Sequence, residues 1–232
     1  ILRNGKKVFD GKTEELDRES LEFYMTGRHI DKSDIYIRDI SHGQPLLTVE
    51  NLEAKGLFRN ISFSLYPGEI LGITGLLGSG RNELAHALFG LRPADSGTIR
   101  VGDKQVVMDS VQTAMENGIA FVPEDRLTQG LLLEQSIANN INICTIDRLT
   151  DNRGFVDQEQ ASNQVARWID NLNIRVASPD NAAKSLSGGN QQRVVIAKWL
   201  ATNPKVLILS GPTVGVDVGS KESIHKILRG LD

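Results

Sequence analysis

Two short glycine-rich stretches of this sequence have the residue types that bind phosphate. Residues 186–192 read LSGGNQQ and open onto an apolar pattern that predicts a helix, and residues 75–83 read GLLGSGRNE. Glycine lets a ligand approach the backbone closely, and a helix N-terminus points free N–H groups and about half a positive charge outward. Both stretches therefore predict anion sites, for which phosphate is the best-suited ligand.

The elements around the second of these stretches fit a phosphate-binding loop. Ile70–Thr74 predicts a short apolar strand, and residues 84–89 predict a helix that Gly90 ends. A strand, a glycine loop and a helix in this order cradle phosphates with backbone N–H groups. A dinucleotide-binding fold would need a third glycine at Glu83, and a plain strand-to-helix turn would not need three glycines. The expected nucleotide contacts are Gly75, Leu76, Leu77, Gly78, Ser79, Gly80, Arg81, Asn82 and Glu83.

The first stretch continues into a strand and a polar turn. Asn203 and Pro204 end its helix, and Val206–Leu209 (VLIL) predicts a buried strand. The strand leads into residues 210–213 (SGPT) and then to Asp217. Here the sequence resembles the ABC ATPases: LSGGN resembles their signature motif, and VLIL followed by SGPT resembles their Walker B strand.

A further apolar strand is predicted at residues 119–122 and ends in residues 123–126 (PEDR). From the residues alone, a charged surface turn is an equally good interpretation of Glu124. In ABC ATPases this strand ends in the Q-loop, whose glutamine meets metal and attacking water, and Glu124 takes that position. The resemblance is to the second half of sugar-importer ATPases, in which VPEDR is followed by a Gly-Leu-Leu run.

The resemblance also implies roles within a pair of domains. ABC nucleotide-binding domains pair head to tail, so each ATP lies between one partner's glycine loop and the other's signature. This half would then offer a good signature to the first half's ATP, while its own glycine loop would form a poor catalytic site. The residues with implied catalytic roles are Glu124 at the Q-loop position, Ser187, Gly188, Gly189 and Asn190 of the signature, and Asp217 of the D-loop.

Two motifs depart from the family pattern at the positions that carry the chemistry. In the glycine loop Arg81 replaces the lysine, and Asn82 replaces the metal-binding Ser or Thr. Arginine keeps the charge as a planar fork, and an asparagine amide is a less favourable magnesium ligand here. Ser210 and Gly211 replace the Walker B acids that organise magnesium and position water. We therefore expect ATP as the cofactor, poor binding of Mg²⁺ and no metal ligand of this chain.

The resemblance covers nearly the whole chain and implies an α/β fold, a P-loop NTPase of ABC type. Such a fold has a mixed sheet core, an antiparallel β subdomain and a helical subdomain. Residues 45–232 would form this nucleotide-binding domain, with the helical subdomain at about 127–185. Residues 1–43, with a predicted hairpin and a short helix, are either an extension of the same domain or, as the resemblance favours, the tail of a preceding nucleotide-binding domain plus a linker. Because the chain stops inside a helical pattern at Asp232, we expect a C-terminally truncated fragment whose switch histidine lies beyond it.

Composition sets outer bounds on the function. The chain has 232 residues, 40% of them apolar, and a net charge of −3, so it is long enough for a real core and has no basic excess that favours nucleic acid. A single cysteine, Cys144, excludes an internal disulfide and suits a reducing compartment. No apolar run approaches the roughly 20 residues that a membrane-spanning helix needs.

We expect an ATP-binding subunit that energises an ABC-type monosaccharide importer at the cytoplasmic face of the membrane, as a peripheral protein. Its expected partners are the first nucleotide-binding half of the same protein, the transmembrane permease subunits and, indirectly, a sugar-binding protein. The full-length protein would be an ATPase, whereas hydrolysis by this half alone stays open. Two alternatives are an ABC ATPase of a non-transport class and a regulatory module that senses nucleotide without catalysis. The missing Walker B acids keep the second alternative open.

Overall fold

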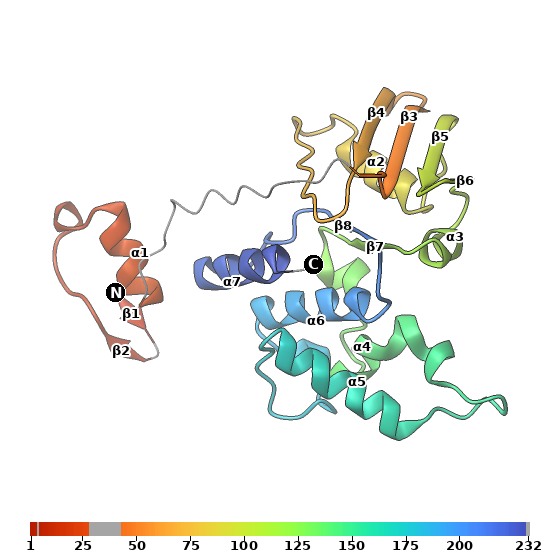
Figure 1. Cartoon of the computed structure of the whole chain (residues 1–232). Helices are drawn as coiled ribbons and strands as arrows, with labels where there is room; N and C mark the ends of the chain where they lie inside the picture. Colours follow the sequence, from red (N-terminus) through yellow and green to blue (C-terminus); the bar gives the residue numbers. More distant parts are fainter. Residues whose placement is uncertain (4, 28–42, 231–232) are drawn as a thin grey trace.

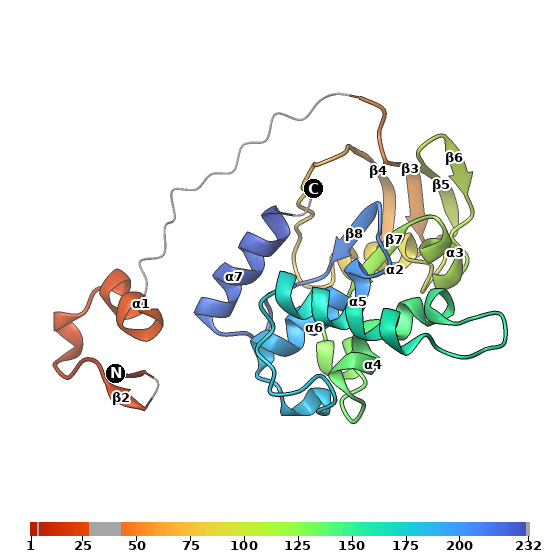
Figure 2. The same ribbon diagram turned by 60° about the horizontal axis from the view of Figure 1, so that its bottom comes forward.

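A computed structural model of the chain describes residues 1–3, 5–27 and 43–230 (Figure 1). Residues 1–27 contain a short antiparallel hairpin and a helix, α1, that contacts helix α7, and both views place this unit beside the larger body (Figures 1 and 2). The predicted hairpin and helix are confirmed, while most of the expected linker, residues 28–42, lies outside the described residues. The elements of this unit are β1 Leu2–Arg3, β2 Lys6–Lys7, a 3-10 turn at Thr13–Glu15 and α1 Arg18–Thr26.

A four-stranded antiparallel sheet in the order β4-β3-β5-β6 begins the larger body. Leu47, Val49 and Leu52 are buried, and the polar or charged residues between them are more exposed, which is the pattern of a sheet with one face on the core. The predicted antiparallel β subdomain is therefore confirmed. Its strands are β3 Leu47–Ala54, β4 Phe58–Leu65, β5 Ser96–Val101 and β6 Lys104–Val106, and helix α2 Arg81–Leu88 follows β4 in the chain.

A separate parallel pair of strands forms the centre of the molecule. β7 Ile119–Val122 and β8 Val206–Leu209 pair residue by residue, from Ile119 opposite Val206 to Val122 opposite Leu209. All four residues of β7 are buried, as a short continuous apolar run predicts. Helix α3 Val111–Glu116 packs against β7.

The chain between β7 and β8 is mostly helical. Among these helices α6 Gly188–Leu200 lies in the middle, with other elements packed around it (Figure 2). α6 contacts α4, α5, α7, β7 and the turn 126–130, and its residues 194–197 are completely inaccessible to solvent. Four consecutive apolar residues point to nearly every side of a helix, so this part of α6 must be covered on nearly every side, which explains its central place. The remaining elements are a π-type turn at Arg126–Gly130, α4 Ile137–Asn142, a 3-10 segment at Ile143–Leu149, α5 Gln158–Asn171, a 3-10 turn at Ala183–Ser185 and, after β8, α7 Val218–Arg229.

One predicted strand is wrong. Ile70–Thr74 has no regular structure, and Ile70 and Ile73 are 67% and 50% exposed. A short apolar run becomes a strand only when a neighbouring strand supplies ladder hydrogen bonds, and among the described strands β8 pairs with β7 alone. Apolar composition predicted the tendency of this segment to be buried, but the described part of the chain supplies no partner for it.

None of the helices in the described part of the chain combines the length and the apolar composition needed to cross a lipid bilayer.

Candidate functional site

The two helices that follow the glycine-rich stretches begin differently from the other α-helices in the described residues. In α1, α3, α4, α5 and α7, the N-cap side chain accepts a hydrogen bond from the backbone N–H three residues later. The caps of α2 and α6, Gly80 and Ser187, make no such bond. The first backbone N–H groups of a helix have no acceptor within the helix, and a capping side chain satisfies one of them. In α2 and α6 this N–H group therefore remains available to another acceptor. Both predicted anion sites thus coincide with open helix N-termini.

The loop before α2 is a tight turn that projects its side chains into solvent. Ser79 N–H donates to the carbonyl of Leu76 at 3.0 Å, and the Leu76 and Leu77 side chains are 86% and 98% exposed. Gly80 has a φ of +88°, and a Cβ at this position would lie 2.3 Å from the carbonyl oxygen of Leu57. Only glycine fits there, because a side chain would meet both the unfavourable φ and the backbone of the neighbouring strand.

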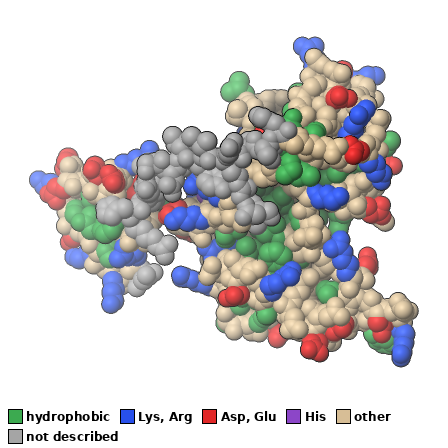
Figure 3. All heavy atoms as spheres, viewed as in Figure 1, with side chains coloured by type: hydrophobic (Ala, Val, Ile, Leu, Met, Phe, Trp, Pro, Cys, Tyr) green, Lys and Arg blue, Asp and Glu red, His purple; other side chains and the backbone are tan. Residues whose placement is uncertain are grey.

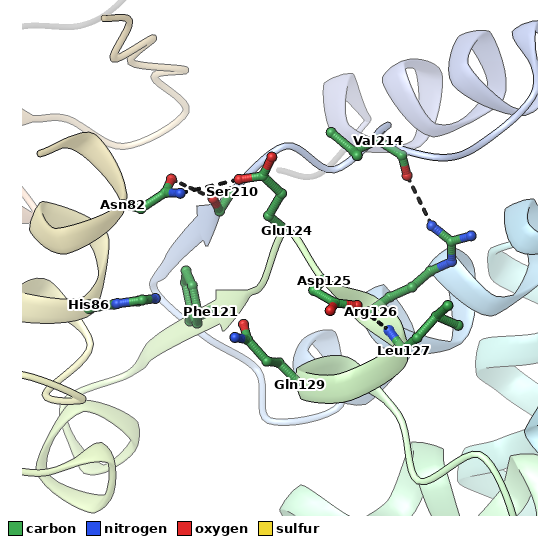
Figure 4. A pocket seen from close by; sticks show the side chains of 10 residues that line it. All are labelled: Asn82, His86, Phe121, Glu124, Asp125, Arg126, Leu127, Gln129, Ser210 and Val214. Atoms are coloured by element: carbon green, nitrogen blue, oxygen red, sulfur yellow. Dashed lines mark hydrogen bonds between the residues drawn. The ribbon is translucent and has the colours of Figure 1, made fainter. Parts of the chain in front are cut away.

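Next to this loop, a cavity of about 450 Å³ opens between α2, β7, residues 124–129 and the end of β8 (Figure 4). His86 of α2 and Phe121 of β7 stack edge to face at 5.6 Å between ring centroids on one side of it. Gln129 and Arg126 come from the opposite side (Figure 4). The cavity thus lies at the carboxyl ends of the two parallel strands, where α/β folds place their ligands.

Three site residues from distant parts of the chain meet at one end of this cavity. The amide Nδ2 of Asn82 donates to Oε2 of Glu124 at 3.2 Å, and Ser210 Oγ donates to Oδ1 of Asn82, also at 3.2 Å (Figure 4). The amide oxygen of Asn82 therefore already accepts a hydrogen bond from the hydroxyl of Ser210. Among residues 1–3, 5–27 and 43–230, no group of three or more His, Cys, Asp or Glu side chains lies together as a metal site would need.

The residues of the first stretch, 186–192, are held by contacts within the chain, and the helix that they open has no side-chain cap. Asn190 Nδ2 donates to Ser187 Oγ at 3.2 Å, and Asn190 Oδ1 accepts from the backbone N–H of Arg175 at 3.1 Å. A Cβ at Gly189 would lie 2.2 Å from Ser220 Oγ, and one at Gly188 would lie 2.8 Å from Nη2 of Arg126. Sequence reasoning explained these glycines by the approach of a ligand, but contacts within the chain also require them.

Asp217 is placed by α7, whose N-terminus it caps. Oδ1 accepts from the Ser220 backbone N–H at 2.9 Å, and Oδ2 accepts from the Ser220 hydroxyl at 2.7 Å. The hydrogen bond from the Ser220 hydroxyl, with smaller contributions from backbone hydrogen bonds, lowers the pKa of Asp217 below 3.8. Asp217 is therefore ionised at neutral pH. It lies beside the start of α6, because a Cβ at Gly189 would be 3.8 Å from its Oδ2.

The structure brings some predicted residues together and keeps others apart. Asn82 and Glu124 meet at the cavity, and the start of α6 meets Asp217, but α2 and α6 lie on different parts of the molecule (Figures 1 and 2). The sequence analysis missed Arg126, which donates hydrogen bonds to the carbonyls of Val214 and Gly215 (Figure 4). Its only sequence signal was its place directly after two acidic residues.

Comparisons with known proteins agree with this geometry. A family model described as ABC transporter matches residues 58–214. The chain is 42% identical to the ribose import ATP-binding protein RbsA of Geobacillus kaustophilus and 40% identical to that of Clostridium tetani, in each case over 100% of this chain and 46% of the relative. It is 39% identical to a putative ribose/galactose/methyl galactoside import ATP-binding protein of Rhizobium meliloti, over 100% of this chain and 45% of the relative. The chain thus spans about half the length of the curated relatives that it matches.

Solved structures match at the level of the fold. An ATP-binding cassette of an ABC transporter superimposes with a TM-score of 0.68 at 24% identity, covering 80% of this chain and 76% of its own. The protein cbiO1 from Clostridium perfringens, part of an ABC transporter complex, has a TM-score of 0.65 at 26% identity, covering 81% of this chain and 73% of its own. A P-loop α/β fold of ABC type is the architecture that these structures share with the chain.

Proposed function

This chain belongs to the ABC transporter family, and we propose that it is the second nucleotide-binding half of an ATP-binding protein that energises monosaccharide import. The curated relatives with about 40% identity are named as ribose or ribose/galactose import ATP-binding proteins and are about twice as long. The single observation that carries the proposal is the pair of uncapped helix N-termini at α2 and α6. They offer N–H groups to phosphate where the family binds ATP.

We propose unequal roles for these two helix ends. Residues 75–83 would hold a nucleotide of this half, and Ser187–Asn190 with Asp217 would act on the ATP of the first half. The wide separation of α2 and α6 within one chain supports pairing with a second domain, because neither helix end can complete the other's site. Residues 45–232 would be the nucleotide-binding domain, with its helical subdomain at about 127–185, and residues 1–43 the tail of the preceding domain and a linker.

The site of this half would bind Mg²⁺ poorly and hydrolyse ATP slowly. Asn82 already uses both ends of its amide, one on Glu124 and one on Ser210. A metal ion would have to break the Ser210–Asn82 bond and would find a hydroxyl and a glycine where the family supplies two carboxylates. Loss of a positioned base typically lowers a rate by about a hundred- to ten-thousandfold.

The partners follow from this assignment. The first nucleotide-binding half would supply the facing glycine loop, and permease subunits in the membrane would hold the protein as a peripheral subunit at the cytoplasmic face. A sugar-binding protein would act through the permease. Nucleic acid is not among the proposed partners.

A titration of ATP against this chain, with and without magnesium, tests the cofactor proposal. We expect weak binding that changes less than about tenfold, or 1.4 kcal/mol, when magnesium is added, because the ligands for the metal are absent. Asn82→Ser, which restores the family hydroxyl, is the matched variant and should increase the magnesium effect. A tenfold or larger gain with the wild-type chain would contradict the proposal.

A second function is favoured by the same two residues, Ser210 and Gly211. Without acidic groups at these positions, the half could bind nucleotide and signal its presence without turnover. Measuring ATP hydrolysis by the whole protein, with and without its permease, separates the two functions. Permease-stimulated turnover supports the transport ATPase, whereas nucleotide binding without turnover supports the regulatory module.

A further inference from the structure

Arg126 lies where the first turn of α6 meets the segment that leads into α7. Its guanidinium donates from Nη1 to the carbonyl of Val214 at 3.0 Å and from Nη2 to the carbonyl of Gly215 at 3.1 Å. Its Nε donates to Oε1 of Gln191 at 3.4 Å. One side chain therefore joins two segments that carry site residues.

The space around the guanidinium is closed by two glycines. A Cβ at Gly188 would lie 2.8 Å from Nη2 of Arg126, and a Cβ at Gly215 would lie 3.0 Å from Nη1. Gly215 also has a φ of +68°, which favours glycine independently. Gly188 has no positive φ. Its lack of a side chain matters because Arg126 and the Gly215 carbonyl occupy the space that a Cβ would need.

The acceptors of Arg126 are themselves held in place. Gln191 is 7% exposed, and its amide also donates to the carbonyl of Ala183 at 3.4 Å, just before the signature. The turn that Arg126 begins is bound to α6 at a second point, where Lys198 Nζ donates to the carbonyl of Gly130 at 2.5 Å. Hydrogen bonds near both ends therefore join this turn to α6.

We propose that Arg126 is a positioning residue that fixes the signature residues Ser187–Asn190 relative to Asp217. The planar fork of arginine matches two adjacent carbonyls, which a lysine ammonium cannot engage in the same way. Its three acceptors are neutral oxygens, so its positive charge also adds to the positive end of α6. The inference rests on the proposed action of the signature on the first half's ATP.

The test is steady-state hydrolysis of ATP by the whole ATP-binding protein with its permease in liposomes. Arg126→Gln should lower kcat about tenfold or more and change KM for ATP less than about twofold, because the signature acts only when the two halves close. Arg126→Lys should lose less activity, with a kcat between those of wild type and Arg126→Gln. Arg148→Gln is the matched control, since Arg148 is exposed and also donates to a carbonyl, that of Thr202 at 3.1 Å, and it should hydrolyse ATP like wild type.

A double-mutant cycle with Gly188→Ala separates positioning from a general loss of stability. Gly188→Ala alone should lower kcat, in part by displacing the guanidinium, and the loss that it causes should be smaller in the Arg126→Gln background, because the group that it displaces is gone. Additive effects would overturn the inference, and so would a wild-type kcat in Arg126→Gln or an effect on KM alone. Thermal unfolding checks that Arg126→Gln is folded. If it is not, the kcat values of Arg126→Lys and Gly188→Ala would test the inference instead. Absence of hydrolysis by the wild-type complex would instead overturn the proposed function itself.

Discussion

The N-termini of α2 and α6 have the same local chemistry but different surroundings. Both helices begin without a side-chain cap and leave N–H groups for an anion. The loop before α2 extends into solvent, with Leu77 98% exposed. At the start of α6, Gly188 and Gly189 pack closely against Arg126 and Ser220 while Ser187 stays exposed, and we call this the enclosed site. The space-filling view shows several areas of hydrophobic side chains on the visible face of the larger body (Figure 3). Packing therefore distinguishes an exposed loop before one helix from a closely packed first turn of the other.

This difference matters because the two ends would act at different stages. Donors that are held in place before reaction stabilise developing charge without reorganisation, and this is usually a large contribution to catalysis. The enclosed end of α6 suits such a late role, while the open loop suits nucleotide capture. The predictions below test this contrast.

The largest expected effect is at the enclosed site. Ser187→Arg should lower ATP hydrolysis by the whole protein about a hundredfold or more, since the exposed Ser187 would carry a bulky side chain into the space for phosphate. Ser187 is a better target than Gly189, where any side chain would first collide with Ser220. Ser185→Arg adds the same charge two residues away and is the control. Equal losses in the two variants would show that added charge, not the signature, is responsible.

In the open loop, glycines should differ in importance according to their surroundings. Gly80→Ala should destabilise the chain by about 3 kcal/mol, because its Cβ would meet the Leu57 carbonyl in addition to the strain of a positive φ. Gly78→Ala, at a φ of +79° in open space, should cost only about 1 kcal/mol. Urea unfolding followed by circular dichroism measures both, and similar costs would refute the packing argument for Gly80.

Asp217 supports the enclosed site through the start of α7. Asp217→Ala should lower the free energy of unfolding by about 1 kcal/mol at neutral pH, because it removes the cap of α7. The pKa of Asp217 is lower in the folded chain than the ordinary 3.8, so the stability that its charge contributes is present above pH 3.8 and lost as pH falls through the lowered value.

Unfolding measured across this acidic range gives the sign of the effect. The difference between wild type and Asp217→Ala should shrink toward low pH. Asp217→Asn retains a capping oxygen but has no titrating group. The contribution of this cap to the free energy of unfolding should therefore stay constant over the same pH range. A difference that grows as the pH falls would contradict the assigned pKa direction.

The smallest effect is expected at Arg81, in the open loop. Arg81→Ala should leave hydrolysis by the whole protein within about threefold of wild type, because Arg81 is exposed and would contact only the site that we propose to be the weaker one. Turnover by the permease complex is the measurement. If Arg81→Ala were as damaging as Ser187→Arg, the unequal roles of the two sites would be wrong and this half would be a working catalytic site.

Much of the fold follows from local patterns in the sequence. The strands Ile119–Val122 and Val206–Leu209 were predicted with the bounds that the structure has, because each is a short apolar run between polar or turn-forming residues. Helix starts are marked locally as well, because the side chains of Ser110 and Asp157 accept hydrogen bonds from the first turns of α3 and α5. Both signals depend on residues within one turn or one strand of each other.

The predicted strand at Ile70–Thr74 shows where such patterns are insufficient. Its composition is that of a buried strand, yet it is irregular and largely exposed. A strand depends on hydrogen bonds to a neighbour, and no local pattern states whether that neighbour is present.

The sequence by itself determined the motifs, their order and the departures at Arg81, Asn82, Ser210 and Gly211. Only the tertiary structure decided how these residues are used. Asn82 is bonded to Ser210, 128 residues away, and Arg126 to Val214, 88 residues away. Periodicity and capping are short-range properties that a sequence displays directly, whereas such contacts depend on how separately formed elements pack together, and packing is decided by the shape of the whole chain.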